Sequence, residues 1–136
     1  MQTEAEASAE PVADVSGMEL YNDGSFRIVL TDASMSIFSE CELGLYMENL
    51  SDKTVDVYSG GATVNGETVA CGVWNQLRSD TRAITNGYVY ELDEMDITQM
   101  SQIEEITLQL YVEYGGDGDV LQPIHETVTF DPNTIS

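Results

Sequence analysis

The side chains that could support metal binding, redox chemistry or nucleophilic catalysis are few in this sequence. There are two cysteines, Cys41 and Cys71, and one histidine, His125. No Cys-x-x-Cys motif is present, and one histidine is a poor basis for a zinc site. No Gly-x-Ser-x-Gly motif offers a nucleophile for a base to activate, so we interpret His125 as an ordinary surface histidine. These residue types predict a protein that is not an enzyme.

The two cysteines are both expected in the core. Cys41 continues the register of Leu43, and Cys71 continues the register of Val69, in segments that alternate between apolar and polar residues. One interpretation is a disulfide that closes a loop of about 30 residues and contributes about 3 kcal/mol in the chain-entropy model. The other is two separate buried thiols that pack as small hydrophobic groups. The sequence leaves both open.

Acidic clusters are the remaining candidates for cation binding. Asp117 and Asp119 lie in a glycine-rich turn, and Asp93, Glu94 and Asp96 precede a predicted helical turn. Calcium needs six or more oxygens that converge on one point, and neither cluster matches the Asp-x-Asp-x-Asp-Gly loop. We expect no obligatory cofactor. Weak calcium binding at Asp117 and Asp119 is one hypothesis, and a solvated loop is the other.

Three aromatic residues form the candidate binding patch. Tyr46 and Tyr111 fall on the polar faces of their predicted strands, and they would form an exposed cross-strand pair if those strands were neighbours. Exposed tyrosines are enriched in recognition surfaces, although such a pair can also serve only to stabilise a sheet. Trp74 falls opposite the predicted core register. It could pack on a sheet edge or stack against a sugar ring.

Short strands must position these residues. Alternation of apolar and polar residues predicts strands at 17–21, 25–31, 42–48, 54–58, 61–65, 67–73, 86–92, 106–114 and 120–130. The residues expected in the core of this set are Leu43, Leu45, Met47, Ile106, Leu108, Leu110, Val112, Val128 and Phe130.

Turn signals agree with an antiparallel arrangement. Asn65-Gly66 is the strongest hairpin signal, because both residues accept the positive φ of a type I′ turn. One short helical turn is expected near residues 96–102, with Asp96 as its cap. About eight or nine short strands with frequent turns predict an all-β, antiparallel, immunoglobulin-like sandwich.

Charge and composition exclude several classes of partner. The chain has 25 acidic and 4 basic residues, a net charge of −21. Such a surface repels nucleic acid phosphates and anionic lipids. The longest aliphatic run is Ile28-Val29-Leu30, so we expect no membrane insertion. Residues 1–16 are small and acidic and predict a disordered linker; residues 17–132 form the predicted sandwich, and 133–136 a C-terminal tail.

Three segments resemble a family of secreted Gram-positive domains of unknown function. Residues 43–53 (LGLYMENLSDK) resemble the family's apolar strand and Ser-Asp-Lys turn, Val64-Asn65-Gly66 its hairpin, and residues 91–108 its helical turn leading into a strand. The family consists of extracellular or lipid-anchored immunoglobulin-like sandwiches related to a secreted mycobacterial immunoprotective antigen. The resemblance covers about residues 17–132 and implies a cell-surface lipoprotein, but it transfers no functional residues.

Two features depart from the pattern of this family. The pair Cys41 and Cys71 is not part of it, and the chain shows neither a leader nor a lipid-attachment cysteine. We expect the leader and the lipid anchor to lie upstream of Met1.

Three functions are compatible with these observations. The first is a non-catalytic extracellular or cell-surface interaction domain that recognises a protein or a glycan. The second is a carbohydrate-binding module that uses Trp74 and tyrosines, which a coplanar row of exposed rings would favour. The third, and least favoured, is a small acid-dependent hydrolase, which requires a cleft with two suitably spaced carboxylates.

The charge generates the first testable prediction. Repulsion within a domain of this charge opposes compaction, and salt screens it over about 8 Å at physiological ionic strength. Sodium chloride is therefore expected to raise the melting temperature between low and moderate concentration. A melting temperature that stays flat or falls would mean that the acidic groups are organised by bound cations or internal hydrogen bonds.

Overall fold

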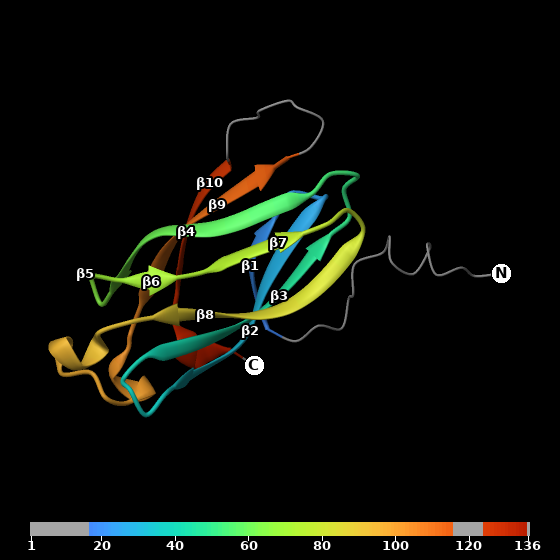
Figure 1. The fold of residues 1–136 in the computed structure, drawn as a ribbon. Helices are drawn as coiled ribbons and strands as arrows, with labels where there is room; N and C mark the ends of the chain where they lie inside the picture. Colours follow the sequence, from blue (N-terminus) through green and yellow to red (C-terminus); the bar gives the residue numbers. More distant parts are fainter. Residues whose placement is uncertain (1–16, 116–123, 136) are drawn as a thin grey trace.

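Two antiparallel sheets pack face to face in the computed structural model, which describes residues 17–115 and 124–135 (Figure 1). The first sheet has the order β1 (Met18–Asn22), β2 (Phe26–Met35), β3 (Cys41–Asn49), β8 (Thr81–Val89) and β6 (Cys71–Gly72). The second has the order β10 (Ile124–Phe130), β9 (Ile106–Tyr114), β4 (Val55–Val64) and β5 (Glu67–Val69), and β7 (Trp74–Leu77) also pairs with β4.

This strand order is that of the immunoglobulin fold. The strands β2, β3, β8 and β6 correspond to A, B, E and D of that fold, and β4, β9 and β10 correspond to C, F and G. The additional strand β1 pairs with β2 at the edge of the first sheet. The prediction of an all-β, antiparallel sandwich is confirmed.

The core lies between the inner faces of the two sheets. Of the nine residues expected there, eight are buried: Leu43, Leu45, Met47, Ile106, Leu108, Leu110, Val112 and Phe130. Val128 is only partly buried against this core, because β10 is an edge strand with a neighbour on one side alone. No helical segment within residues 17–115 and 124–135 is long and apolar enough to cross a membrane.

Several predicted boundaries were wrong. The segments 54–58 and 61–65 are one strand, β4, and the segment 67–73 contains β5 and β6, which belong to different sheets. The strand predicted at 86–92 is β8, which begins at Thr81 and ends at Val89.

The helical turn expected near 96–102 is two separate 3-10 turns, η1 (Leu92–Met95) and η2 (Met100–Gln102). Asp96 does not cap a helix start; it ends η1 in a left-handed conformation, with φ 61°. The left-handed backbone of Asp96 and the extended backbone of Gln99, with φ −136°, separate the two turns, while Ile97 and Ile103 are both buried.

The ordered chain also continues beyond residue 132. A third turn, η3 (Pro132–Thr134), follows β10, and Ile135 packs against the core. The Asn133 amide donates hydrogen bonds to the carbonyls of Met100 and Ile103, both at 2.9 Å. Residues 133–135 are therefore part of the domain and not a tail. The predicted linker, residues 1–16, lies outside the described residues.

The predicted hairpin at Asn65-Gly66 is confirmed. It joins β4 to β5, and both residues have positive φ, 51° and 88°. The Asn65 side chain also donates to the Gln102 carbonyl at 3.0 Å and accepts from the Glu104 amide at 2.8 Å. The tip is thus fastened to the segment that leads into β9.

Asp23, in the β1–β2 turn, joins the two sheets. Its Oδ2 accepts hydrogen bonds from the hydroxyl of Tyr21 at 2.7 Å and from that of Tyr114, on β9 of the other sheet, at 2.6 Å. Its Oδ1 accepts from the backbone amides of Ser25 and Phe26, both at 2.8 Å. Loss of hydration alone would raise the pKa of Asp23, but these hydrogen bonds outweigh it and lower the pKa below 3.8.

Replacement of this carboxylate is expected to loosen the sandwich. Asp23→Ala removes four acceptor contacts, and we expect it to reduce the free energy of unfolding by about 3 kcal/mol at neutral pH. Because the folded pKa is lowered, the stabilisation is complete above pH 3.8 and is lost as the pH falls through the folded value. Urea unfolding at several pH values measures it. The exposed Asp52→Ala is the control, with an expected change within about 0.5 kcal/mol; equal losses in the two variants would contradict the assignment.

Candidate functional site

The outward-facing side chains of the second sheet form the candidate site. In β9, Leu108, Leu110 and Val112 point into the core, so the alternate residues Gln109 and Tyr111 point outward. The same alternation in β4, β7 and β10 brings outward positions of four strands into rows across the sheet. We call this surface, over β7, β4, β9 and β10, the outer face.

A β-bulge at Gly60-Gly61 sets the geometry of this face. The register of β4 against β9 shifts between Ser59 and Ala62, so both glycines lie opposite one residue of β9. Val55 and Val57 are buried before the bulge and Ala62 and Val64 after it, so the extra residue keeps both halves of β4 directed into the core.

An aromatic row crosses the outer face. Trp74, Tyr58, Tyr111 and His125 are successive cross-strand partners on β7, β4, β9 and β10. The rings of Tyr58 and Tyr111 stack with centroids 5.2 Å apart, and those of Tyr111 and His125 stack at 4.6 Å. Trp74 is 66% exposed at the end of the row. We call these four residues the aromatic ridge.

A hollow of about 160 Å³ lies beside the aromatic ridge. Its lining residues are Gly61, Ala62, Thr63, Thr68, Thr107 and Gln109. The hollow exists because the bulged glycines carry no side chains there: a Cβ on Gly61 would meet no atom within 4 Å. A Cβ on Gly60 would lie 2.7 Å from Cε2 of Tyr111, so the ridge packs directly against the bulge.

Polar side chains border the hollow and the ridge. On the far side of the hollow, Thr68, Thr63, Thr107 and Thr129 are successive cross-strand partners, and the hydroxyls of Thr107 and Thr129 lie 3.0 Å apart. Hydroxyl and amide groups therefore line the hollow, and the aromatic ridge lies next to it across the bulge. Such a surface can both stack and hydrogen-bond a polyhydroxylated ligand.

Two carboxylates border the ridge on its other side. Asp56 and Glu113 are direct cross-strand partners, one outward position away from Tyr58 and Tyr111. Asp56 accepts a hydrogen bond from the Gln76 amide at 2.8 Å. Lost hydration at the sheet surface raises the pKa of Tyr58, and the charges of Glu113 and Asp56 raise it further.

The predicted pairing of Tyr46 with Tyr111 was wrong. Tyr46 lies on β3 in the first sheet and is 8% exposed, whereas Tyr111 lies in the second sheet. The pairing assumed that residues 42–48 form strand C of the immunoglobulin fold. The additional strand β1 makes this segment strand B, and strand C is β4. Tyr58, on β4, occupies the position that was assigned to Tyr46.

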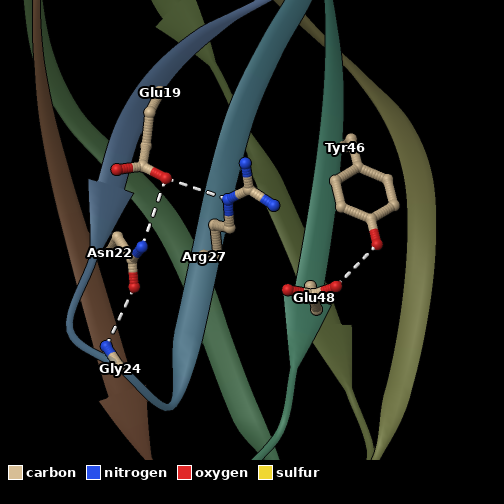
Figure 2. Close-up of polar contacts among 6 residues, drawn as sticks. All are labelled: Glu19, Asn22, Gly24, Arg27, Tyr46 and Glu48. Carbon is tan, nitrogen blue, oxygen red and sulfur yellow. Dashed lines mark hydrogen bonds and ion pairs between the residues drawn. The ribbon is translucent and has the colours of Figure 1, made fainter. Parts of the chain in front are cut away.

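Tyr46 instead belongs to a polar cluster on the outward side of the first sheet (Figure 2). Its hydroxyl donates to Oε2 of Glu48 at 2.9 Å, and Glu48 is fully buried. Burial, together with the hydrogen bond to Glu48 and the charge of Glu48, raises the pKa of Tyr46 to about 12. Figure 2 shows Arg27 on the neighbouring strand β2, next to Glu48.

Two of the four bases surround this buried carboxylate. Arg27 and Arg82 are the cross-strand partners of Glu48 on its two sides, and Nε of Arg82 lies 3.5 Å from Oε2 of Glu48. Nε of Arg27 donates to Glu19 at 2.9 Å, and the Asn22 amide donates to the same Glu19 oxygen at 3.2 Å (Figure 2). We interpret this cluster as structural, because it compensates a buried charge.

The two cysteines are free thiols. Cys41 and Cys71 pair with Val89 from opposite sides of β8, so their Cα atoms are two strand spacings apart, roughly 9 to 10 Å. A disulfide needs Cα atoms within about 7 Å. The interpretation of two separate thiols therefore holds, although only Cys41 is fully buried. Burial raises the pKa of Cys41 to about 11, which makes it a poor nucleophile at neutral pH.

The remaining predicted site residues are those of the acidic clusters and His125, and the structure does not assemble those it describes into a site. Asp117 and Asp119 lie outside the described residues. Asp93, Glu94 and Asp96 are exposed at η1, and within residues 17–115 and 124–135 no group of three or more possible ligands is arranged to hold a metal ion. His125 is exposed as expected, but its stacking on Tyr111 was not anticipated.

The two bulge glycines provide a matched pair of variants. Neither has a positive φ, so alanine fits the backbone at both positions. Gly60→Ala is expected to displace the Tyr111 ring and to lower the free energy of unfolding by about 1 to 2 kcal/mol. Gly61→Ala is expected to be neutral or to stabilise by up to about 1 kcal/mol. Chemical denaturation and the near-ultraviolet circular dichroism of the tyrosines measure both effects; a Gly60→Ala variant that matches the wild type would contradict the packing of the ridge on the bulge.

Comparisons with known proteins give little further information. No family model matches the chain, and no curated protein matches it. The chain is similar to a crystal structure of a protein from Archaeoglobus fulgidus, at 11% identity and a TM-score of 0.34. That similarity covers 84% of this chain and 91% of the other.

Proposed function

We propose that this chain is a non-catalytic, extracellular interaction domain that binds a carbohydrate chain across the outer face of its second sheet. The observation that carries the proposal is the exposed indole of Trp74 in the aromatic ridge, together with the hollow beside the ridge, which is lined by threonine hydroxyls and the Gln109 amide. A sugar ring has an apolar face and a rim of hydroxyl groups, and this combination of side chains is complementary to both.

The arrangement of the rings indicates where a ligand would lie. Tyr58, Tyr111 and His125 are stacked face against face, so they form a ridge and not a coplanar platform. Their ring faces are therefore largely occupied by each other. Within the ridge, the large indole of Trp74, 66% exposed, is the aromatic surface most open to stacking on a sugar.

The hollow can then hold the sugar units next to the one that stacks on Trp74. Gln109 and the threonines that line the hollow offer hydrogen-bond donors and acceptors. The aromatic ridge and the row of threonines each cross four strands, a distance of about 14 Å. An extended oligosaccharide fits this surface better than a compact molecule, because the rows of side chains cross four strands whereas the hollow holds only about 160 Å³. The ligand would run across the strands, from Trp74 toward His125.

The same geometry argues against hydrolysis. Asp56 and Glu113 are close to each other in register, but neither lines the hollow. Hydrolysis requires two carboxylates on either side of the scissile bond, in a site that excludes water. The described strands of the outer face offer a surface that holds a ligand and no cleft that encloses one.

Binding is tested with a glycan array probed by the labelled chain, followed by titration of the bound glycan. Trp74 is the single tryptophan, so its fluorescence reports occupancy of the face. Trp74→Ala is expected to weaken binding about tenfold or more, because it removes the stacking surface. Gly61→Gln is expected to weaken glycan binding as strongly, because its side chain fills the hollow, with little change in stability. Because Trp74→Ala lacks the fluorescent residue, its binding is measured by calorimetry.

The matched control is Ile84→Ala. Ile84 is 84% exposed on the first sheet, so its truncation removes an exposed apolar side chain at the opposite surface. We expect glycan binding by this variant to equal that of the wild type. An array without any bound glycan, or equal losses in Ile84→Ala and Trp74→Ala, would contradict the proposal. Capture of a protein through Trp74 in place of a glycan would redirect it to protein recognition.

A further inference from the structure

The charged groups of the outer face have a single sign. The outward positions described on β4, β7, β9 and β10 include the carboxylates of Asp56 and Glu113 and no lysine or arginine. Arg27 and Arg82, in contrast, lie on the first sheet beside Glu48. A ligand on the outer face therefore meets two carboxylates without a lysine or arginine among these positions, where His125 is the basic side chain.

Asp56 and Glu113 face each other directly across β4 and β9. Like charges at directly opposed positions destabilise a sheet. The polar contact of Asp56 is with the neutral Gln76 amide, at 2.8 Å, which leaves the net charge of the pair unchanged. Repulsion that destabilises a sheet at a binding surface has an explanation if the charges discriminate between ligands.

The position of the pair places it within reach of a bound ligand. Side chains on one face of a strand recur about every 7 Å, so the carboxylates lie about one such step from the rings of Tyr58 and Tyr111. This distance is shorter than the Debye length of about 8 Å at physiological ionic strength, so salt leaves much of the repulsion in place. The pKa of Tyr58 is raised first by lost hydration and then by neighbouring charges that include Glu113 and Asp56, which agrees with this spacing.

We infer that the glycan bound on the outer face carries no anionic substituent, and that Asp56 and Glu113 are the residues that exclude uronic acid, sulfate and phosphate groups. This inference rests on the proposed function, since it names the ligand class for the same site. Neutral sugars would place only hydroxyl groups near the carboxylates, which accept hydrogen bonds from them. An anionic substituent would be repelled and would lose hydration without a partner.

The test uses the same array and then pairs of oligosaccharides that share a backbone and differ in charge, such as galactan with sulfated galactan and xylan with glucuronoxylan. At physiological salt, the wild type is expected to bind the neutral member of a recognised pair at least about tenfold more tightly. The double variant Asp56→Asn/Glu113→Gln is expected to lose most of this preference by gaining affinity for the anionic member. It keeps the Asp56 acceptor oxygen for Gln76.

A variant of equal net charge separates this local effect from general repulsion. Asp93→Asn/Glu94→Gln removes two exposed carboxylates from η1, which lies in the connection between β8 and β9 and not on the outer face. It is expected to retain the preference of the wild type. Equal loss of preference in the two double variants would overturn the assignment to Asp56 and Glu113.

The outcomes distinguish the two proposals. Wild-type binding of both members of a pair with equal affinity would overturn the charge selection and leave the carbohydrate-binding function standing. An array dominated by anionic glycans would also overturn the charge selection and leave the carbohydrate-binding function standing. Absence of any bound glycan would overturn both.

Discussion

Two adjacent glycines in β4 determine how the second sheet can be used. Without the extra residue at Gly60-Gly61, one half of β4 would direct its apolar side chains to solvent, because side chains alternate strictly along a strand. The bulge resolves this conflict and leaves a stretch of backbone without side chains. Tyr111 packs over Gly60, and the space above Gly61 becomes the hollow. Core packing and the shape of the outer face therefore have the same origin.

The two sheets carry their charges differently, and this difference is a consequence of the scarcity of bases. With four basic residues against 25 acidic ones, most carboxylates must remain solvated. Two of the bases flank Glu48, whose complete burial requires compensation. The outer face of the second sheet is left with uncompensated carboxylates. The charge of this face thus follows partly from an electrostatic requirement of the opposite sheet.

Alternation in the sequence was sufficient to predict the fold and most of the core. Residues such as Leu108 and Leu110 have no equally good position outside a two-sheet core, so their strands and faces were predictable. The same reasoning placed Trp74 outside the core, which is where it lies. The signal for Tyr58 was also present, since it alternates with Val55 and Val57, but its strand had no assigned neighbour.

Pairing between strands was the information that alternation could not provide. Tyr46 was assigned to the solvent side from its alternation alone, yet its strand lies between two neighbours, its hydroxyl bonds to the buried Glu48, and it is itself buried. The separation of Cys41 from Cys71 likewise depends on β8 lying between their strands. Neither arrangement is encoded locally. The aromatic ridge could not be predicted for the same reason, because it joins four strands that are distant in sequence.

The contact of Tyr21 and Tyr114 with a single carboxylate oxygen has a consequence at the alkaline limit of stability. Burial and the bond to Asp23 both raise the pKa of each phenol above its ordinary value of 10.0. A raised folded pKa means that stabilisation is complete below pH 10.0 and declines as the pH rises through the folded value. Strong base would therefore destabilise the junction between the sheets, because it removes the phenolic protons through which Tyr21 and Tyr114 hydrogen-bond to Asp23. Ionisation of these two phenols, visible as tyrosinate absorbance, would accompany separation of the sheets and would not precede it.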